Sequence, residues 1–140
     1  MHLLELQEEI KALIKKHEIK VARTKFKSSA GRAIIEQRTI KIPRITDLYT
    51  AAVVIHEISH IILSHADSVT EYVCEYETEK LTIKFLRQFN IHKDYKAEFE
   101  KYVIDAKRNV KICIDRYIRH YEKWEIKPKI RKKISKWANS

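Results

Sequence analysis

The sequence has few of the residues that interrupt regular structure. It contains one Gly and two Pro in 140 residues, and 34% of its residues are charged. Few turn-forming residues, combined with many Lys, Glu, Ile and Leu, favour a mostly helical protein. Apolar residues make up 44% of the chain, which is enough for one core but not for two independent ones. We therefore expect a single domain over residues 1–140.

Cysteine pairs and long apolar runs are also lacking. The only cysteines, Cys74 and Cys113, have no C-x-x-C spacing, and we expect both to be reduced and buried. The longest run without charged residues or histidine, Leu48–Ile55, is too short to span a membrane. Residues 1–5 are followed by acids rather than by an apolar run, so no signal peptide is visible. These features predict a cytoplasmic protein without a membrane span.

The positive charge is concentrated at one end of the chain. The net charge is +10, and residues 101–140 hold thirteen Lys/Arg and four Asp/Glu, which contribute +9 of it. Residues 127–136 contain six of these cations and could bind nucleic acid, an acidic protein or an acidic membrane surface. A solvated, lysine-rich helix explains the same pattern more simply, because charge asymmetry alone is weak evidence for a partner.

Hydrophobic periodicity predicts a helix followed by a small sheet in the N-terminal part. Residues 3–17 have apolar residues at helical spacing, and residues 19–26 alternate as in a strand. Gly31 marks a turn, after which residues 33–36 and 39–42 look like two short strands. We expect an antiparallel sheet of about three strands.

The rest of the chain is predicted to be helical. Thr46 or Asp47 can cap a helix over about 48–64 that is apolar on nearly every side and therefore buried. Ser68 and Glu71 form an expected capping box for a helix that ends near Phe89. Two further helices are expected, over about 94–123 and 128–138. The predicted fold class is α+β and helix-dominated, with a small N-terminal sheet and a basic helical C-terminal portion, 94–138.

The central helix contains the motif H-E-x-x-H, as His56-Glu57-Ile58-Ser59-His60. Histidines at i and i+4 face the same side of a helix, so both imidazoles can bind one metal ion. Glu57 then lies beside the ion, where it can take a proton from water. A pair of surface histidines is the plain alternative, but burying these side chains without partners would cost several kcal/mol. The motif therefore predicts a zinc metallopeptidase with Glu57 as catalytic base.

A catalytic zinc site needs a third protein ligand. The next helix offers Glu71, Glu75, Glu77 and Glu79. Glu71, Glu75 and Glu79 share one face, Glu77 points elsewhere, and the capping box already explains Glu71. Glu75 and Glu79 therefore remain. His65 is a rival ligand, but its spacing from His60 favours a supporting role. His65, Tyr72 and Tyr76 are candidate stabilisers of the transition state, and Glu79, if it is not the ligand, is a further candidate for a supporting role.

Two stretches of this sequence resemble the ImmA/IrrE family of zincin-like metallopeptidases. Residues 56–65 match H-E-x-G-H-x-x-L-x-H except at Ser59, and residues 75–86 follow the pattern E-x-E-A-[ND]-x-F-A-x-x-L-L in part. Thr78 stands at the usual Ala, and Glu79 stands at the usual Asn or Asp. The likeness covers roughly residues 33–90, and the helices over 94–138 have no counterpart.

The resemblance implies a zincin-like fold in which His56, His60 and Glu75 bind zinc and Glu57 is the catalytic base. It also implies a narrow protein substrate such as a repressor-like regulator, and an origin in a mobile element, a virus or a stress-response system. Substrate peptides of such enzymes add to a sheet edge, for which residues 33–36 are our candidate. The main alternative is a regulatory protein on the same scaffold, with structural or vestigial zinc and a basic C-terminus that binds nucleic acid or a partner protein. A third is an inhibitor that blocks a partner without metal.

Overall fold

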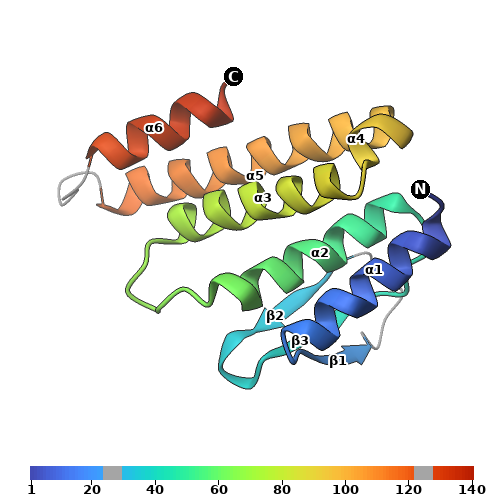
Figure 1. Ribbon diagram of the computed structural model, residues 1–140. Helices are drawn as coiled ribbons and strands as arrows, with labels where there is room; N and C mark the ends of the chain where they lie inside the picture. Colours follow the sequence, from blue (N-terminus) through green and yellow to red (C-terminus); the bar gives the residue numbers. More distant parts are fainter. Residues whose placement is uncertain (24–29, 122–127) are drawn as a thin grey trace.

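The computed structural model describes residues 1–23, 30–121 and 128–140 (Figure 1). Three predicted segments therefore lie partly outside the described residues: strand residues 24–26, helix residues 122–123 and the cation Lys127. The helices are α1 (Leu3–Lys16), α2 (Leu48–Leu63), α3 (Glu71–Gln88), α4 (Ile91–Asp94), α5 (Lys96–Tyr121) and α6 (Pro128–Ala138). The strands are β1 (Lys20–Arg23), β2 (Arg32–Ile34) and β3 (Thr39–Ile42), with a short 3-10 helix, η1 (Ile35–Gln37), before β3. This arrangement confirms the helix-dominated α+β fold class.

The sheet is mixed, so the prediction of an antiparallel sheet was wrong. Its strand order is β1-β3-β2, with β1 parallel and β2 antiparallel to β3. A parallel pair is possible here because the chain between β1 and β3 contains β2, which leaves enough length for the chain to return in the same direction. The strand expected over 33–36 is also shorter, since Ile35 and Glu36 belong to η1. In this order β2 is an edge strand, as expected for that segment.

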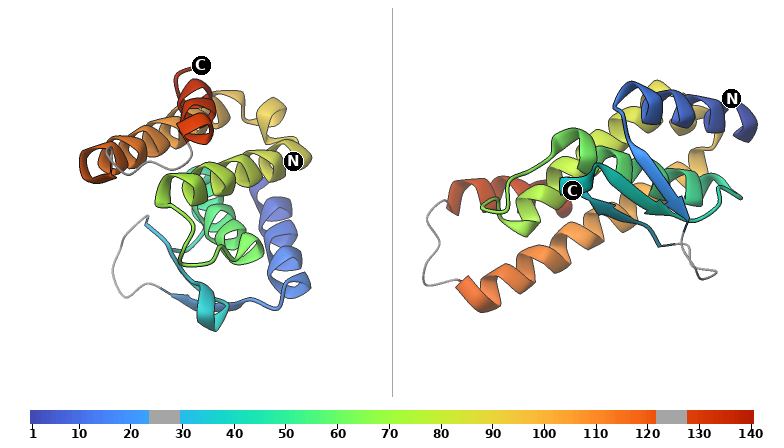
Figure 2. Two further views of the ribbon diagram at one scale, coloured as in Figure 1. Left: turned by 90° about the vertical axis from the view of Figure 1, so that its left-hand side faces the viewer. Right: turned by 90° about the horizontal axis from the view of Figure 1, so that it is seen from below.

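Helix α2 lies at the centre of the molecule. It packs against α1, α3 and α5 and against strands β2 and β3 (Figure 1). Figure 2 shows α1 and α2 together on one face of the sheet. Ten of its sixteen residues are buried, which confirms the expectation of a buried helix. Its start is fixed by Asp47, whose carboxylate accepts a hydrogen bond from the Thr50 backbone N–H while the Thr50 hydroxyl oxygen accepts one from the Asp47 N–H.

Two predicted helix starts differ from the structure. Helix α3 begins at Glu71 with Thr70 as its N-cap, and no side chain caps it, so the capping box of Ser68 and Glu71 was wrong. The Glu71 carboxylate instead accepts a hydrogen bond from Arg116 of α5. The long helix expected from Asp94 begins at Lys96, because the chain first forms the short α4 and breaks at Tyr95.

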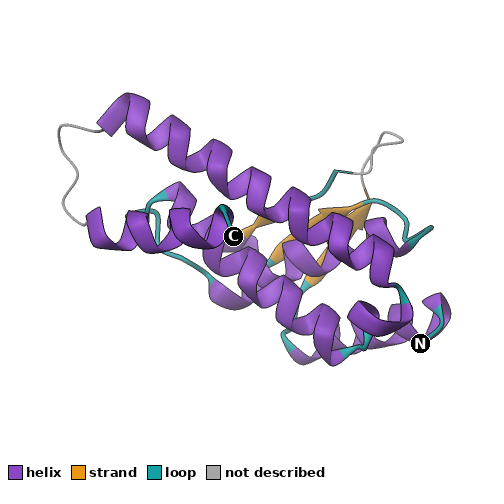
Figure 3. Cartoon of the chain, turned by 90° about the horizontal axis from the view of Figure 1, so that it is seen from above, coloured by secondary structure: helices purple, strands orange, loops and turns teal. Residues whose placement is uncertain are grey.

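The helices beyond α2 form a second layer with its own apolar contacts. Figure 1 shows α5 and α6 on the side of the molecule away from the strands, and Figure 3 shows the same helices from above. Buried residues of α3, α5 and α6 form a cluster of their own: Tyr72, Val110, Cys113, Ile114, Ile134 and Ala138. Both cysteines are free as expected; Cys113 is buried, but Cys74 is only partly so. Among the described residues, no helix combines the length and apolar character that a membrane crossing requires.

Candidate metal centre

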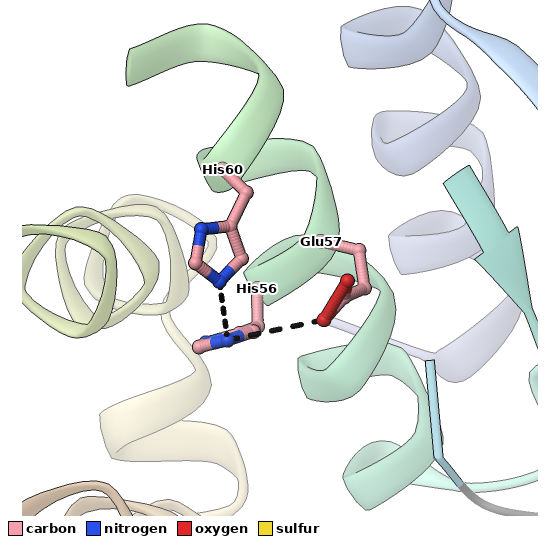
Figure 4. Close-up of side chains that lie close together, drawn as sticks. All are labelled: His56, Glu57 and His60. Atoms are coloured by element: carbon pink, nitrogen blue, oxygen red, sulfur yellow. Dashed lines mark hydrogen bonds and ion pairs between the residues drawn. The ribbon is translucent and has the colours of Figure 1, made fainter. Parts of the chain in front are cut away.

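Helix α2 brings the three polar residues of the H-E-x-x-H motif to one place. His56 and His60 are one turn apart, and their rings meet edge to face with centroids 4.7 Å apart. The two Nε2 atoms approach each other to 3.1 Å (Figure 4). The Glu57 carboxylate lies 3.8 Å from Nε2 of His56. Each side chain is largely buried, with 15%, 17% and 9% exposure for His56, His60 and Glu57.

Helix α3 packs closely on α2 beside the histidines, because the residues that face each other there are small and form hydrogen bonds with one another. Ser59, Thr78 and Thr82 are fully buried. The Thr82 hydroxyl lies within hydrogen-bond reach of both Ser59 Oγ and the Thr78 carbonyl, and the Ser59 hydroxyl donates to the Ile55 carbonyl. These contacts meet the hydrogen-bonding needs of buried hydroxyl groups, which would otherwise destabilise the core. The close packing brings Glu75 and Glu79 of α3 to the histidines.

Glu75 completes a triangle of potential ligands. One carboxylate oxygen, Oε1, lies 3.2 Å from Nε2 of His60, and the other, Oε2, lies 3.6 Å from Nε2 of His56. With the 3.1 Å between the two nitrogens, the closest approaches between the three side chains fall between 3.1 and 3.6 Å. Tetrahedral zinc with ligands at 2.0–2.1 Å requires ligand separations of about 3.3–3.4 Å. The three side chains therefore lie close enough together to share one metal ion.

Further polar groups hold the same three residues in place. Nδ1 of His56 is in direct contact with the Glu79 carboxylate, and Nδ1 of His60 lies 3.3 Å from the Thr78 hydroxyl. The Asn109 side chain of α5 donates a hydrogen bond of 3.1 Å to Oε2 of Glu75. Histidine ligands usually carry such a partner on the nitrogen that faces away from the metal, because it fixes the orientation of the ring. Both rings consequently direct Nε2 to the centre of the cluster.

The only glycine of the chain leaves room for Glu57. A Cβ atom on Gly31 would lie 2.8 Å from Cγ of Glu57 and 3.3 Å from Val53, so any side chain there would displace Glu57. Gly31 does not have a positive φ, so the close approach, not a turn conformation, requires glycine here. The start of the edge strand β2 thus lies directly against the predicted base.

The cluster shifts the pKa values of its members in opposite directions. Burial raises the pKa of Glu57, with only partial compensation by the two histidines, which makes the carboxyl a stronger base than an exposed glutamate. Burial opposes protonation of His56, but the carboxylates of Glu79, Glu75 and Glu57 outweigh it and raise the pKa to about 9. Burial also disfavours ionised Glu75, yet its hydrogen bond to His60 and the histidine charges hold its pKa below the usual value.

The predicted site residues separate into two groups. His56, Glu57, His60, Glu75 and Glu79 lie together, and groups drawn from them could hold a metal ion. The three candidate stabilisers have other partners. His65 lies 2.7 Å from Glu77, whose side chain is exposed. Tyr72 packs on Tyr117, and Tyr76 packs on Trp137.

Four residues of the site were not predicted from the sequence: Gly31, Thr78, Tyr102 and Asn109. Tyr102 is buried, and its hydroxyl donates to the Glu79 carboxylate at 3.4 Å. Gly31 and Thr78 carried a signal, since one is the only glycine and the other replaces a small residue of the family pattern. No signal exists for Tyr102 and Asn109, because their helix comes close to α2 and α3 only in the folded chain.

The chain was also compared with known proteins. No family model, no curated protein and no solved structure matches it. The case for a metal centre therefore rests on the geometry described above.

Proposed function

We propose that this protein is a zinc-dependent endopeptidase. The observation that supports this most strongly is the triangle of His56, His60 and Glu75, in which every ligand is oriented by a further side chain. Two His and one Glu, with an adjacent carboxylate that is not a ligand, form the donor set of catalytic zinc sites in peptidases. His65 pairs with Glu77, so it does not close the fourth position that catalysis requires.

In this proposal each residue has a distinct role. Bound zinc supplies Lewis acidity, which polarises the peptide carbonyl and lowers the pKa of water to about 7. Glu57 accepts the proton from the attacking water and passes it to the leaving amine, a task that its raised pKa favours. Glu79 and Thr78 hold the two histidine rings, and Asn109 holds Glu75. The edge of β2 beside Gly31 is where we place the substrate backbone.

The resemblance to the ImmA/IrrE pattern supports the same assignment. Where that pattern has Gly and Ala, this chain has Ser59 and Thr78, which lie at the contact between α2 and α3 and form hydrogen bonds there. The replacements are therefore compatible with the same helix pair. We propose a regulatory protein of repressor type as the substrate, and a cytoplasmic location that fits the two free thiols.

Replacing Glu57 by Gln tests the proposal, because Gln keeps the shape of the side chain but cannot accept the proton. We expect Glu57→Gln to bind one zinc ion like the wild type and to lower the rate of peptide cleavage by about 10²–10⁴-fold. Metal content and cleavage of a peptide library are measured on the same samples. Glu77→Gln is the matched control, since it removes a carboxylate of the neighbouring helix that contacts His65. Full cleavage by Glu57→Gln would contradict the mechanism.

A second candidate function is the binding of a polyanion, and one observation favours it. The described residues 107–121 and 128–140 contain ten Lys/Arg and a single acid, Asp115. The apolar residues Ile134 and Ala138 of α6 are buried, so this helix presents mainly cations to solvent. Such a surface suits a phosphate backbone better than a membrane, because the buried apolar side cannot insert into lipid. Binding of duplex DNA or RNA that weakens steeply with added salt would support this function.

A further inference from the structure

A small pocket opens beside the candidate metal centre, between α2 and α5. Its volume is about 180 Å³, below the roughly 300–1,000 Å³ of sites for drug-sized ligands, so it suits a single side chain. His56 lines the pocket, and so does Asn109, which donates to Glu75. In a substrate peptide bound at the metal centre, the side chain next to the metal could therefore enter this pocket.

Two carboxylates line this pocket. Glu79 is 3% exposed, and its Oε2 atom has no hydrogen-bond partner among the described residues. A buried carboxylate oxygen without a partner is costly unless a ligand supplies a donor. Asp105 of α5 adds a second, more accessible carboxylate, whose side chain is 33% exposed. The Tyr102 hydroxyl, which also lines the pocket, donates to Oε1 of Glu79, so Oε2 is the oxygen that still lacks a donor.

The remaining walls are apolar or aromatic and match an aliphatic chain. Val53 and Ala106 contribute apolar surface, and Tyr49 contributes a ring that is 40% exposed. Aromatic faces attract cations, and the ammonium group of Lys101 already lies 5.7 Å from the centroid of the Tyr49 ring. A long side chain with a terminal positive charge would fit both the walls and the carboxylates.

The nearby cations of the protein leave Asp105 available. Arg108 approaches Asp105 only to 3.8 Å, and its side chain is 68% exposed. An exposed pair at this distance contributes little, and it can be exchanged for another cation. The net charge of the whole chain is +10, which repels cations in general. The two carboxylates of the pocket attract a cation at this one place.

We propose that the pocket between α2 and α5 binds a basic side chain, Lys or Arg, of the substrate next to the bond that is cut. Asp105 and Glu79 bind the positive charge, and Val53, Ala106 and Tyr49 contact the aliphatic part. The assignment of the ligand as substrate rests on the proposed function. The pocket itself is formed by residues of this chain and can be tested without catalysis.

Binding of three short peptides, followed by NMR, tests this assignment. The peptides are acetyl-Ala-X-Ala-amide with X as Lys, norleucine or Glu, titrated into the metal-free and the zinc-loaded protein. We expect the Lys peptide to bind at least about tenfold tighter than the norleucine peptide and to shift the signals of Val53 and Ala106. Asp105→Asn should reduce this ratio to about twofold. Asp115→Asn changes the net charge equally on an exposed part of α5, and it should leave the ratio unchanged.

The outcomes separate this inference from the proposed function. Equal binding of the Lys and norleucine peptides, tighter binding of the Glu peptide, no binding of the Lys peptide, or equal ratios in Asp105→Asn and Asp115→Asn would each overturn the pocket assignment. Selective binding of the Lys peptide without cleavage of any peptide by the zinc-loaded protein would overturn the proposed hydrolysis alone. Cleavage without a preference for Lys or Arg beside the cut bond would overturn the pocket alone.

Discussion

The contact between α2 and α3 differs in kind from the contact between α5 and α6. The first contact buries Glu79 and fully buries Ser59, Thr78 and Thr82. The second buries Val110, Ile114, Ile134 and Ala138, and its charged groups face solvent. Buried ionisable groups destabilise a fold unless they are paired or bind a metal, whereas exposed cations cost almost nothing. The buried groups of the first contact are paired with one another and could hold a metal ion, whereas the exposed cations of the second are weak evidence for a partner.

Removing a metal ligand in the contact between α2 and α3 should have the largest effect on zinc affinity. No residue of the contact between α5 and α6 should affect zinc binding as strongly. Glu75→Ala is expected to lower zinc affinity by more than the roughly 10–100-fold that loss of a supporting partner costs, because a direct donor disappears. Competition with a zinc chelator measures the affinity. Glu77→Ala on the same helix is the control and should bind zinc as the wild type does. Unchanged affinity in Glu75→Ala would mean that another carboxylate, such as Glu79, is the ligand.

The contact between α5 and α6 should respond to apolar truncation, not to loss of charge. Ile134 is 1% exposed, so Ile134→Ala should lower the free energy of unfolding by about 2–5 kcal/mol. Lys133 is exposed on the same helix, and Lys133→Gln should change this free energy by less than about 0.5 kcal/mol. Urea denaturation measures both. A large loss of stability in Lys133→Gln would show that the basic face has a structural role.

The orientation of His56 can be tested through Glu79. Glu79→Gln keeps a polar group near Nδ1 of His56 but removes the charge, and we expect zinc affinity to fall by about 10–100-fold. The measurement is again competition with a chelator, with Glu77→Gln as the control. A fall as large as that of Glu75→Ala would instead indicate that Glu79 binds the metal directly.

The features of the fold and of the candidate site that could be predicted from the sequence are those that depend on local patterns. The i,i+4 spacing of His56 and His60 acts within one helix, and it was predicted correctly. The cap is also local: the sequence left it open between Thr46 and Asp47, and the structure has Asp47. Contacts between distant segments decide the features that were missed. Gly31 was expected to form a turn, but its role depends on the nearby Glu57 side chain. The parallel pairing of β1 with β3 and the hydrogen bond from Asn109 to Glu75 likewise depend on tertiary packing that no local pattern encodes.

The smallest expected effect is the release of protons from the site when zinc binds. Burial opposes protonation of His56, but Glu79, Glu75 and Glu57 raise its pKa to about 9, so we expect the ring to be protonated at pH 7.5 in the metal-free protein. A histidine must be neutral to bind zinc, so binding should release about one proton, and affinity should fall about tenfold for each pH unit below this pKa.

Calorimetric titrations with zinc in two buffers of different ionisation enthalpy measure this release. Glu79→Gln removes a carboxylate that raises the pKa, so it should release less than the wild type, whereas Glu77→Gln should release as much. Release that is equal in Glu79→Gln and the wild type would show that Glu79 does not hold the proton on His56. Glu79, although buried in α3, would then have no electrostatic role at the metal centre. Only the metal ligands would distinguish the contact between α2 and α3 from the contact between α5 and α6.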